Sequence, residues 1–502
     1  MRGESVDVAM SQSYEVALAP ERHLISDRLV IAAAVLAFCA TRYWWFIERV
    51  VPFGGALLGH RLVAGVAGAA LIMFAVNARR LHVLIALGAV GLILVGGSGA
   101  AYSWGHAQPR TVGNYSGIAI IRSDPKPYRA AQRVVLEIEG ERFETYAYGP
   151  PGRRLRNRLM GESVFVSGTR TGLRAEQTKW MAPRHVVGSF TVTAVSEQFG
   201  YGAPLYRSAN RIRRVLLRTA ATMPKSEAAL FLGLIIGDDR AQPIAMRDAF
   251  RAAGLSHLTA VSGQNVAFVL VVVSPLLKRL RTWWQFVATL GTLSWFVVLT
   301  RIEPSVLRAV TMAGLAAFGF ARGRELSPLR ILSCSIIGLI AIDPMLAWSI
   351  GFAMSVGATA GLVVLTPQIA KLLKRRGLRE WCIQPLATTL GAQLGVMPIS
   401  ALVFHNGPVL GIFANLLAVP IAGLIMLVGL PIGLLSAALP LPLVHVVMWP
   451  MLLAVRWVWW VAAVTQRAAL GQWLNIACWL VLMVLAVKWW RRYPHDGTDM
   501  AK

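Results

Sequence analysis

The sequence has few charged residues and very few acidic ones. Asp, Glu, Lys and Arg make up 15% of its 502 residues, against about a quarter in soluble domains, which excludes a large soluble protein. Acidic residues number 24 and basic residues 50, a formal net charge of +26. The positive bias of membrane-protein loops accounts for part of this excess. The remainder indicates an anionic partner, either nucleic acid or lipid head groups.

Cysteine clusters, leader patterns and catalytic motifs are also missing. Cys39, Cys334, Cys382 and Cys478 lie one each in or beside apolar segments, so their spacing predicts no disulfide framework and no zinc site. The N-terminus lacks the basic-then-apolar pattern of a cleaved signal peptide, and we expect the first apolar run to stay as an anchor. There is no Walker loop, Ser/His/Asp layout or carboxylate pair. We therefore expect no enzyme activity, metal or cofactor.

Apolar runs near the bilayer length of about 20 residues dominate what is present. They fall at about 29–47, 62–77, 81–103, 255–277, 283–300, 305–321, 330–347, 349–368, 381–404, 410–436, 443–463 and 472–490. The pattern predicts a polytopic α-helical membrane protein of about twelve spans.

Basic loops between these runs predict the orientation. They are Arg79-Arg80, Lys278 to Arg281, Arg322 to Arg330, Lys371 to Arg379 and Arg491-Arg492. With twelve spans all five fall on one side, which the positive-inside rule makes cytoplasmic. We expect a multi-pass protein of the bacterial inner membrane with both termini in the cytoplasm and the long segment after the third run in the periplasm.

The periplasmic segment, residues 104–206, has the pattern of a small β domain. Residues 133–148 alternate apolar and polar around Gly140-Glu141, which predicts a hairpin, and residues 162–170 and 185–194 supply further strands. Turn residues separate these strands: Pro150, Pro151, Gly152 and Gly172. An OB-like fold is our expectation, although the pattern alone does not choose it over another small β-barrel.

Residues 207–253 form a transition to the membrane core. Four arginines, at positions 207, 211, 214 and 218, recur on one helical face, with Ile212, Val215 and Leu216 on another. This predicts an amphipathic helix on the outer membrane surface, and a second one over about 243–253. The expected order is 1–28, cytoplasmic segment; 29–103, three membrane helices; 104–206, β domain; 207–253, surface helices; 254–490, membrane core; and 491–502, cytoplasmic tail.

Polar residues inside the predicted spans mark a candidate site. Polar groups in hydrocarbon cost free energy unless they find partners or water, so we expect a wet vestibule near the outer surface. The candidates are Ser256, His257, Ser262, Gly263, Gln264, Asn265, Arg308, Asp343, Gln393 and Asn415. Arg308 and Asp343 either pair or line water, and structural pairing or helix capping is the alternative. Ser262-Gly263 predicts either a helix break lining a cavity or close helix packing.

The β domain and the arginine helix carry a second candidate site. Residues 104–200 hold 14 Lys and Arg against 8 Asp and Glu, a net charge of +6. Candidate DNA contacts are Arg129, Arg142, Arg153, Arg154, Arg156, Arg158, Lys179, Arg207, Arg211, Arg214 and Arg218. Interleaved aromatic residues, on which unpaired bases stack, are Tyr128, Phe143, Tyr146, Tyr148 and Trp180; Phe143 and Tyr148 are expected in the core. The alternative is a basic surface facing anionic lipid.

Residues 254–268 closely resemble the signature of the ComEC family, the inner-membrane channel of bacterial natural transformation. The match holds through Ser262-Gly263 and departs at Gln264-Asn265, where Leu-His is usual. Further resemblances lie at Gly237-Asp238 with Arg240, Arg308-Ala309, Asp343-Pro344, Gly351-Phe352 and the segment ending at Pro420; Ala353 replaces a usual Gln. The good match covers about 225–430.

This resemblance implies an OB-like domain and passage of single-stranded DNA across the membrane. It implies partners: the lipid bilayer, a periplasmic DNA receptor, a separate nuclease, and a cytoplasmic motor or single-strand-binding protein. The metallo-β-lactamase-like domain of many family members, with its His-x-His-x-Asp-His motif, has no counterpart here. Without the resemblance, a small-molecule or lipid-linked transporter ranks above a DNA channel, and a scaffold without a path is a third possibility. The oligomeric state stays open.

Overall fold

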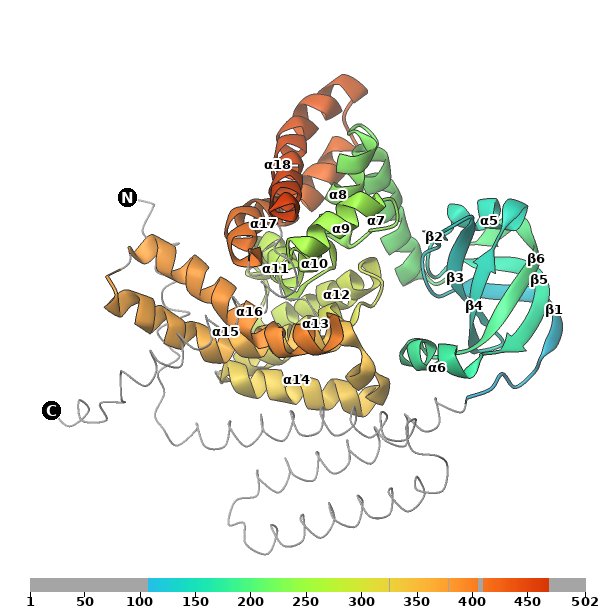
Figure 1. Cartoon of the computed structure of the whole chain (residues 1–502), viewed down its shortest axis with the longest axis horizontal. Coiled ribbons are helices and arrows are strands. Elements are labelled where there is room, and N and C mark those ends of the chain that lie inside the picture. Colours follow the sequence, from blue (N-terminus) through green and yellow to red (C-terminus); the bar gives the residue numbers. More distant parts are fainter. Residues whose placement is uncertain (1–106, 325, 378, 405–409, 469–502) are drawn as a thin grey trace, which may run out of the picture. The chain divides into compact units, whose positions relative to one another are not determined.

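The computed structural model describes residues 107–324, 326–377, 379–404 and 410–468. They divide into two compact units, one holding residues up to 212 together with 269–356, the other holding 213–268 and the residues from 357 onward. Figure 1 follows the elements along the chain. The predicted segments 1–28, 29–103 and 491–502 and the run 472–490 lie outside the described residues.

A curved six-stranded sheet forms the N-terminal part of the first unit (Figure 1). Its strands are β1 (Gly113–Ile121), β2 (Lys126–Tyr128), β3 (Ala131–Ile138), β4 (Glu141–Ala147), β5 (Ser163–Gly172) and β6 (Val186–Gly200). The pairing order is β1-β5-β6-β4-β3-β2, and β1 also pairs with β3, so the pairings of five strands return to their starting point. Only β4 and β6 run parallel.

The predicted hairpin at 133–148 is confirmed as β3 and β4. Glu139 and Gly140 both have positive φ, the backbone of the two-residue turns that match strand twist. Phe143 is fully buried in the sheet's core, as predicted. Tyr148 was predicted in the core wrongly, because its side chain is 61% exposed. It is the residue before a short helix, where the alternation of β4 has already ended.

Short helices fill the connections of the sheet. These are α5 (Gly149–Arg156), α6 (Ala175–Met181) and the 3-10 helix η1 (Ala182–Arg184). Pro150 and Pro151 occupy the first turn of α5, where a missing N–H costs nothing. Gly152 lies so close to the Ala147 carbonyl oxygen that a Cβ there would overlap it. The two prolines therefore start α5, and the missing Cβ of Gly152 allows the helix to pack against the end of β4.

The transition segment forms helices that are mostly short. They are α7 (Pro204–Ala220), α8 (Lys225–Ile236), α9 (Ile244–Ala252) and α10 (Ser256–Thr259). The amphipathic helices predicted at 207 onward and about 243–253 are confirmed as α7 and α9. Helix α8 is buried over its last eight residues and ends at Gly237 in the left-handed conformation, the usual helix stop.

The described apolar runs all form helices. They are α11 (Gly263–Leu277), α12 (Thr282–Leu299), α13 (Pro304–Ala321), α14 (Pro328–Ile342), the 3-10 helix η2 (Pro344–Trp348), α15 (Ile350–Arg375), α16 (Glu380–Phe404), α17 (Gly411–Ser436) and α18 (Leu441–Arg467). Five of them, α12, α13, α15, α17 and α18, are long and apolar enough to cross a membrane, and α11 and α14 are shorter apolar helices. The protein is a membrane protein, and the count of twelve spans stays a prediction.

Two predicted spans are divided, 255–277 into α10 and α11 and 330–347 into α14 and η2. The run 330–347 becomes α14 and η2, because the Asp343 carboxylate accepts the N–H of Met345 and Pro344 starts a new helix. In the second unit α15 and α16 pack at backbone contact: a Cβ at Gly361 would overlap the Gly391 carbonyl oxygen. Gly357, whose Cβ would likewise overlap the Gly395 carbonyl oxygen, and Gly361 therefore allow the two helices to pack closely.

Candidate functional site

The signature segment is broken rather than continuous. Helix α10 ends at Thr259, Ala260 is extended, and α11 begins at Gly263. The helix break predicted at Ser262-Gly263 is confirmed. Backbone groups at such a break are not all paired within a helix, and at membrane depth this is tolerated where protein or a water-filled cavity surrounds them.

Asn265 secures the start of α11 to the end of α8. Its side chain is 3% exposed and its Nδ2 donates to the Leu234 carbonyl oxygen over 3.0 Å. Leu234 lies in the last turn of α8, where carbonyls have no partner within the helix. Ser262 Oγ lies 3.4 Å from Asn265 Oδ1. Asn265, one of the two residues that depart from the family pattern, therefore acts as a helix-end partner.

The first half of α17 runs along this break. A Cβ on Gly411 would lie 3.1 Å from the Ala253 carbonyl oxygen, just before α10. A Cβ on Gly423 would lie 3.4 Å from the Phe268 ring and 3.5 Å from Gln264 Nε2, on α11. Both glycines allow α17 to approach the signature segment closely.

Two amide oxygens beside this contact are buried without a hydrogen-bond partner among the described residues. They are Oδ1 of Asn415, a residue that is 5% exposed, and Oε1 of Gln393. Gln393 Nε2 would lie 3.6 Å from a Cβ on Gly411, one turn before Asn415. Buried polar atoms nearly always have a partner, so each of these two oxygens offers an acceptor that no described residue uses.

Ser256 and His257 lie at the edge of this group. Both side chains are exposed, and His257 Nδ1 lies 3.2 Å from the Gly254 carbonyl oxygen. Six vestibule candidates share the α10–α11 segment, and Gln393 and Asn415 join them within the second unit. We call Gln264, Gln393 and Asn415, which flank α17 or lie on it, the amide cluster.

Arg308 and Asp343 belong to the first unit, and the predicted ion pair between them is wrong. Arg308 is buried and its Nε donates to Ser355 Oγ over 2.9 Å. Asp343 Oδ1 instead lies 3.2 Å from His185 Nε2. Asp343 ends α14 and faces η1 of the sheet domain, a tertiary contact that no local sequence pattern predicts.

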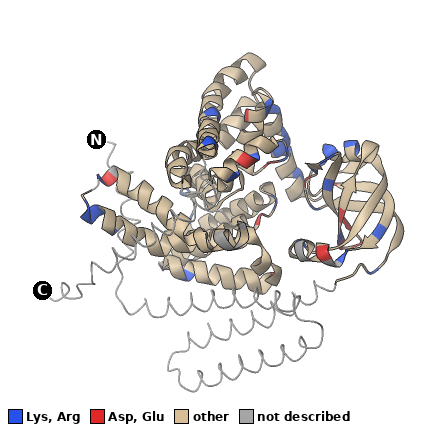
Figure 2. Cartoon of the chain, in the orientation of Figure 1, with Lys and Arg blue, Asp and Glu red and all other residues tan. Residues whose placement is uncertain are grey.

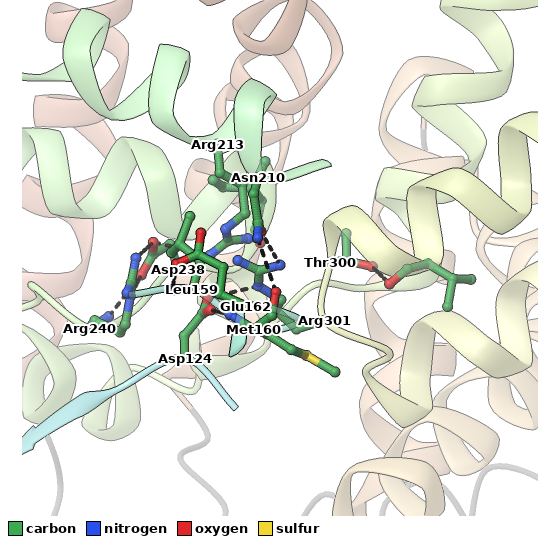
Figure 3. A network of polar contacts seen from close by, with 12 residues as sticks. Asp124, Leu159, Met160, Glu162, Asn210, Arg213, Asp238, Arg240, Thr300 and Arg301 are labelled. Carbon is green, nitrogen blue, oxygen red and sulfur yellow. Dashed lines mark hydrogen bonds and ion pairs between the residues drawn. The ribbon is translucent and has the colours of Figure 1, made fainter. Parts of the chain in front are cut away.

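A polar network in the first unit ties the sheet to the turn between α12 and α13 (Figure 3). Arg301 Nε lies 2.8 Å from Asp124 Oδ2, and Arg301 Nη1 donates to Asn210 Oδ1 over 2.9 Å. The Asp124 and Arg301 side chains are 7% and 11% exposed. The Met160 N–H donates to Asp124 Oδ1, and Asn210 Nδ2 donates to the Met160 carbonyl. Each chain segment is thus held to the others.

The turn itself adopts an unusual backbone. Arg301 and Ile302 both have positive φ, 68° and 60°, a region that β-branched residues avoid. Such conformations persist where surrounding contacts over-determine them. Neither Asp124 nor Arg301 is singled out by sequence; the one available signal is a lone arginine directly after an apolar run.

The second unit also holds a buried carboxylate, Asp238, whose ion pairs the sequence did not predict. Asp238 lies 3.0 Å from Arg213 and 2.6 Å from Arg240. Burial alone would raise the pKa of Asp238, but hydrogen bonds from Arg240 and the charges of both arginines hold that pKa well below its usual range. Arg213 does not lie on the helical face of α7 that carries the other four arginines. An arginine on the apolar side of an amphipathic helix is the sequence signal that could have indicated its buried ion pair.

Helix α18 carries an ion pair within its apolar sequence. Arg456 Nε lies 3.1 Å from Glu227 Oε1 at the start of α8. An arginine in the middle of an apolar run is a functional or structural signal by itself, and here it finds an acidic partner in the same unit.

The arginine run at α5 divides into two pairs. Arg154 donates to the Val195 carbonyl and lies 3.1 Å from Glu197. Arg158 donates to the Glu197 carbonyl over 2.7 Å and lies 3.8 Å above the Phe199 ring. These two arginines bind β6.

Arg153 and Arg156 are exposed, and no described residue pairs with either. Figure 2 shows basic residues on α5. These two are therefore the members of the run that can bind an external anion. The side chains of Lys179 and Trp180 lie outside the described part of the chain.

A second exposed group lies at β2. The Tyr128 ring packs edge-on against Tyr146 at 5.3 Å between centroids, and Arg129 lies 5.8 Å from the Tyr128 ring. Arg142 instead turns toward Glu137, 3.7 Å away. On α7, Arg207, Arg211 and Arg218 are exposed and Arg214 is half-buried, so the predicted basic face exists.

Comparisons with known proteins identify the family. Residues 234–492, half of the chain, match the family model described as Competence protein. The chain belongs to the competence protein family. It is 26% identical over 292 residues to Uncharacterized protein YcaI of Escherichia coli (strain K12), covering 53% of this chain and 37% of that protein.

Two further competence relatives match. ComE operon protein 3 of Bacillus subtilis (strain 168) is 23% identical over 318 residues, 62% of this chain and 39% of that protein. Competence protein ComA of Neisseria gonorrhoeae is 28% identical over 176 residues, 33% of this chain and 25% of that protein. The matched part thus spans under two fifths of each relative's length. No solved structure matches the chain.

Proposed function

We propose that the protein passes single-stranded DNA across the bacterial inner membrane during natural transformation. Membership of the competence family supports the process. The broken helix between α10 and α11, near the Gln393 and Asn415 oxygens that have no partner among the described residues, is the observation that carries the proposal. Neutral amides suit a long polyanion, which must be held weakly enough at many points to keep moving.

The sheet is proposed to be an OB-like domain that gathers DNA outside the membrane. Its pairing order, the parallel β4–β6 pair and a helix between β4 and β5 support this assignment. Arg153 and Arg156 on α5 and the Tyr128–Arg129 group offer cations and an aromatic ring to a phosphate backbone with unpaired bases.

The proposal places the sheet in the periplasm and both termini in the cytoplasm, following the basic loops. In this view the protein conducts without catalysing a reaction. A periplasmic receptor delivers the DNA, a separate nuclease removes one strand, and a cytoplasmic motor or single-strand-binding protein draws the other inward.

The deciding experiment deletes the gene and follows labelled DNA. We expect DNA bound outside the cell to be unchanged while nuclease-protected internal DNA and transformants are lost. Undiminished internal DNA in the deletion strain would refute the channel. Loss of a small-molecule uptake activity with normal DNA import would instead support a secondary transporter.

A further inference from the structure

The end of the α12–α13 hairpin opposite Arg301 is an aromatic and basic surface outside the proposed DNA path. The two helices pack against each other and are joined by the turn at 300–303. The residues before α12 and those after α13 therefore lie at the same end of the hairpin. Both belong to the first unit.

Three rings and a guanidinium form a continuous row across this end. Trp283 stacks on Phe286 with 5.3 Å between centroids, and Phe286 contacts Phe318 of α13 at 5.8 Å. The Arg322 guanidinium lies 4.9 Å above the Phe318 ring. The cation–π contact stabilises this position of Arg322, so the aromatic row ends in a positively charged group.

Exposed cations lie next to α12 and α13 in the sequence at this end of the hairpin. They are Lys278, Arg279, Arg281, Arg322 and Arg324. No described acidic residue pairs with them, and Glu325 is the single acidic residue near them in the sequence. Five positive charges and one negative charge leave a net of +4. The surface requires an anionic partner for charge balance.

The apolar surface that continues from this end identifies the partner. Trp283 and Trp284 are 58% and 65% exposed, and Leu276, Val287 and Leu290 farther along α11 and α12 are exposed as well. Tryptophan beside basic residues is typical of the boundary between head groups and acyl chains. Nucleic acid would match the charges but would leave the aliphatic side chains in water.

We propose that this aromatic–basic end binds an anionic phospholipid. The lipid phosphate lies among Arg281, Arg322 and the neighbouring cations, the glycerol region lies against Trp283, and the acyl chains follow the exposed aliphatic residues of α12. Because the cations flank an aromatic row, the site recognises a phosphate carried on an apolar tail.

The test measures lipid retained by the purified full-length chain in native mass spectrometry. Phosphatidylglycerol and phosphatidylcholine are compared, with inorganic phosphate as a competitor. Arg281→Gln combined with Arg322→Gln should weaken phosphatidylglycerol retention about fivefold per cation removed. The matched control is Lys371→Gln with Arg375→Gln on α15, two exposed cations without a described ring contact. Gel-filtration profiles verify that both variants are folded.

We expect the control to retain phosphatidylglycerol like the parent, and Trp284→Ala to lower retention of phosphatidylglycerol and phosphatidylcholine by a similar factor, because the two lipids share their apolar part. Equal losses in the two double variants would show general attraction of basic loops to an anionic surface and would overturn the site. Displacement of the lipid by inorganic phosphate at millimolar concentration would overturn the lipid as the ligand.

Discussion

The Asp124–Arg301 network and the amide cluster differ in the kind of polar group that each buries. In the first, a carboxylate and a guanidinium are buried together as an ion pair, and Asn210 and the Met160 backbone supply further hydrogen bonds. In the second, Asn415 is equally buried but its Oδ1 has no described partner. An ionised group deprived of water needs a partner inside the fold, whereas a neutral amide can keep an unused acceptor for a ligand.

Under the proposed function, this difference distinguishes residues that hold the fold together from residues that contact the transported DNA. Charges that are paired within the fold hold segments in place, as Asp238 also does with Arg213 and Arg240. The uncharged side chains of the amide cluster can form weak hydrogen bonds that are easily exchanged. Substitutions that exchange one kind of site for the other should therefore separate loss of folding from loss of transport.

The largest expected effect comes from breaking the Asp124–Arg301 pair. Arg301→Ala leaves Asp124 buried without its counter-charge and should lower the free energy of unfolding by about 3–5 kcal/mol. Thermal melting of the purified chain measures this. Arg110, whose side chain is 85% exposed beside Glu141, is the control, and Arg110→Ala should change stability by less than about 1 kcal/mol. Equal effects in the two variants would contradict a structural role for the buried pair.

In the second unit, Asp238 is also a buried carboxylate held by ion pairs, and the stability that it contributes should depend on pH. Because its pKa in the folded protein lies below the unfolded value of about 3.9, its stabilising effect is complete above about pH 4 and is lost as the pH falls further. Asp238→Asn should cost about 3 kcal/mol at neutral pH. Melting temperatures measured from pH 7 downward should fall in acid more steeply for the parent than for the variant; parallel curves would argue against this assignment.

Asn415 of the amide cluster and Asn265 at the start of α11 provide a direct comparison between a buried amide without a described oxygen partner and one that is hydrogen-bonded. Asn265→Leu removes the donor to the Leu234 carbonyl and should destabilise the protein by about 1–3 kcal/mol. Asn415→Leu removes an oxygen that has no described partner, so stability should change little while nuclease-protected internal DNA falls. Comparing melting with DNA uptake for the two variants distinguishes these roles. Normal uptake with Asn415→Leu would remove Asn415 from the path.

The smallest expected effect concerns the arginines of α5. Replacing Arg153 and Arg156 by Gln should weaken single-stranded DNA binding and lower the slope of log affinity against log salt by about 1.4, since each phosphate contact on a single strand contributes about 0.7. Stability should be unchanged.

Replacing Arg154 and Arg158 removes the same charge but also the contacts to β6, and this pair should lower stability. Filter binding at several salt concentrations and melting curves separate the two pairs. An unaltered salt slope after Arg153 and Arg156 are replaced would show that α5 does not contact phosphate.

Periodicity predicted most helices because apolar length is a local property. The runs at 283–300 and 410–436 correspond to α12 and α17 within two residues, and Ser262-Gly263 predicted the break before α11. Tyr148 failed because alternation does not reveal where a strand gives way to a helix. The Arg308–Asp343 prediction failed because similar depth in two spans does not make two residues neighbours; each found its partner in another element.

By itself, the sequence determined the membrane class, the inserted sheet, the positions of the described spans and the family, since hydrophobic runs, strand alternation and motifs are carried by neighbouring residues. The tertiary structure alone decided which charges pair, and which arginines of α5 and which amide oxygens have no partner among the described residues. Those outcomes depend on contacts between segments that are distant in the sequence. Burying a polar group costs free energy unless a partner forms a hydrogen bond with it, so the partners available in the fold decide the outcome.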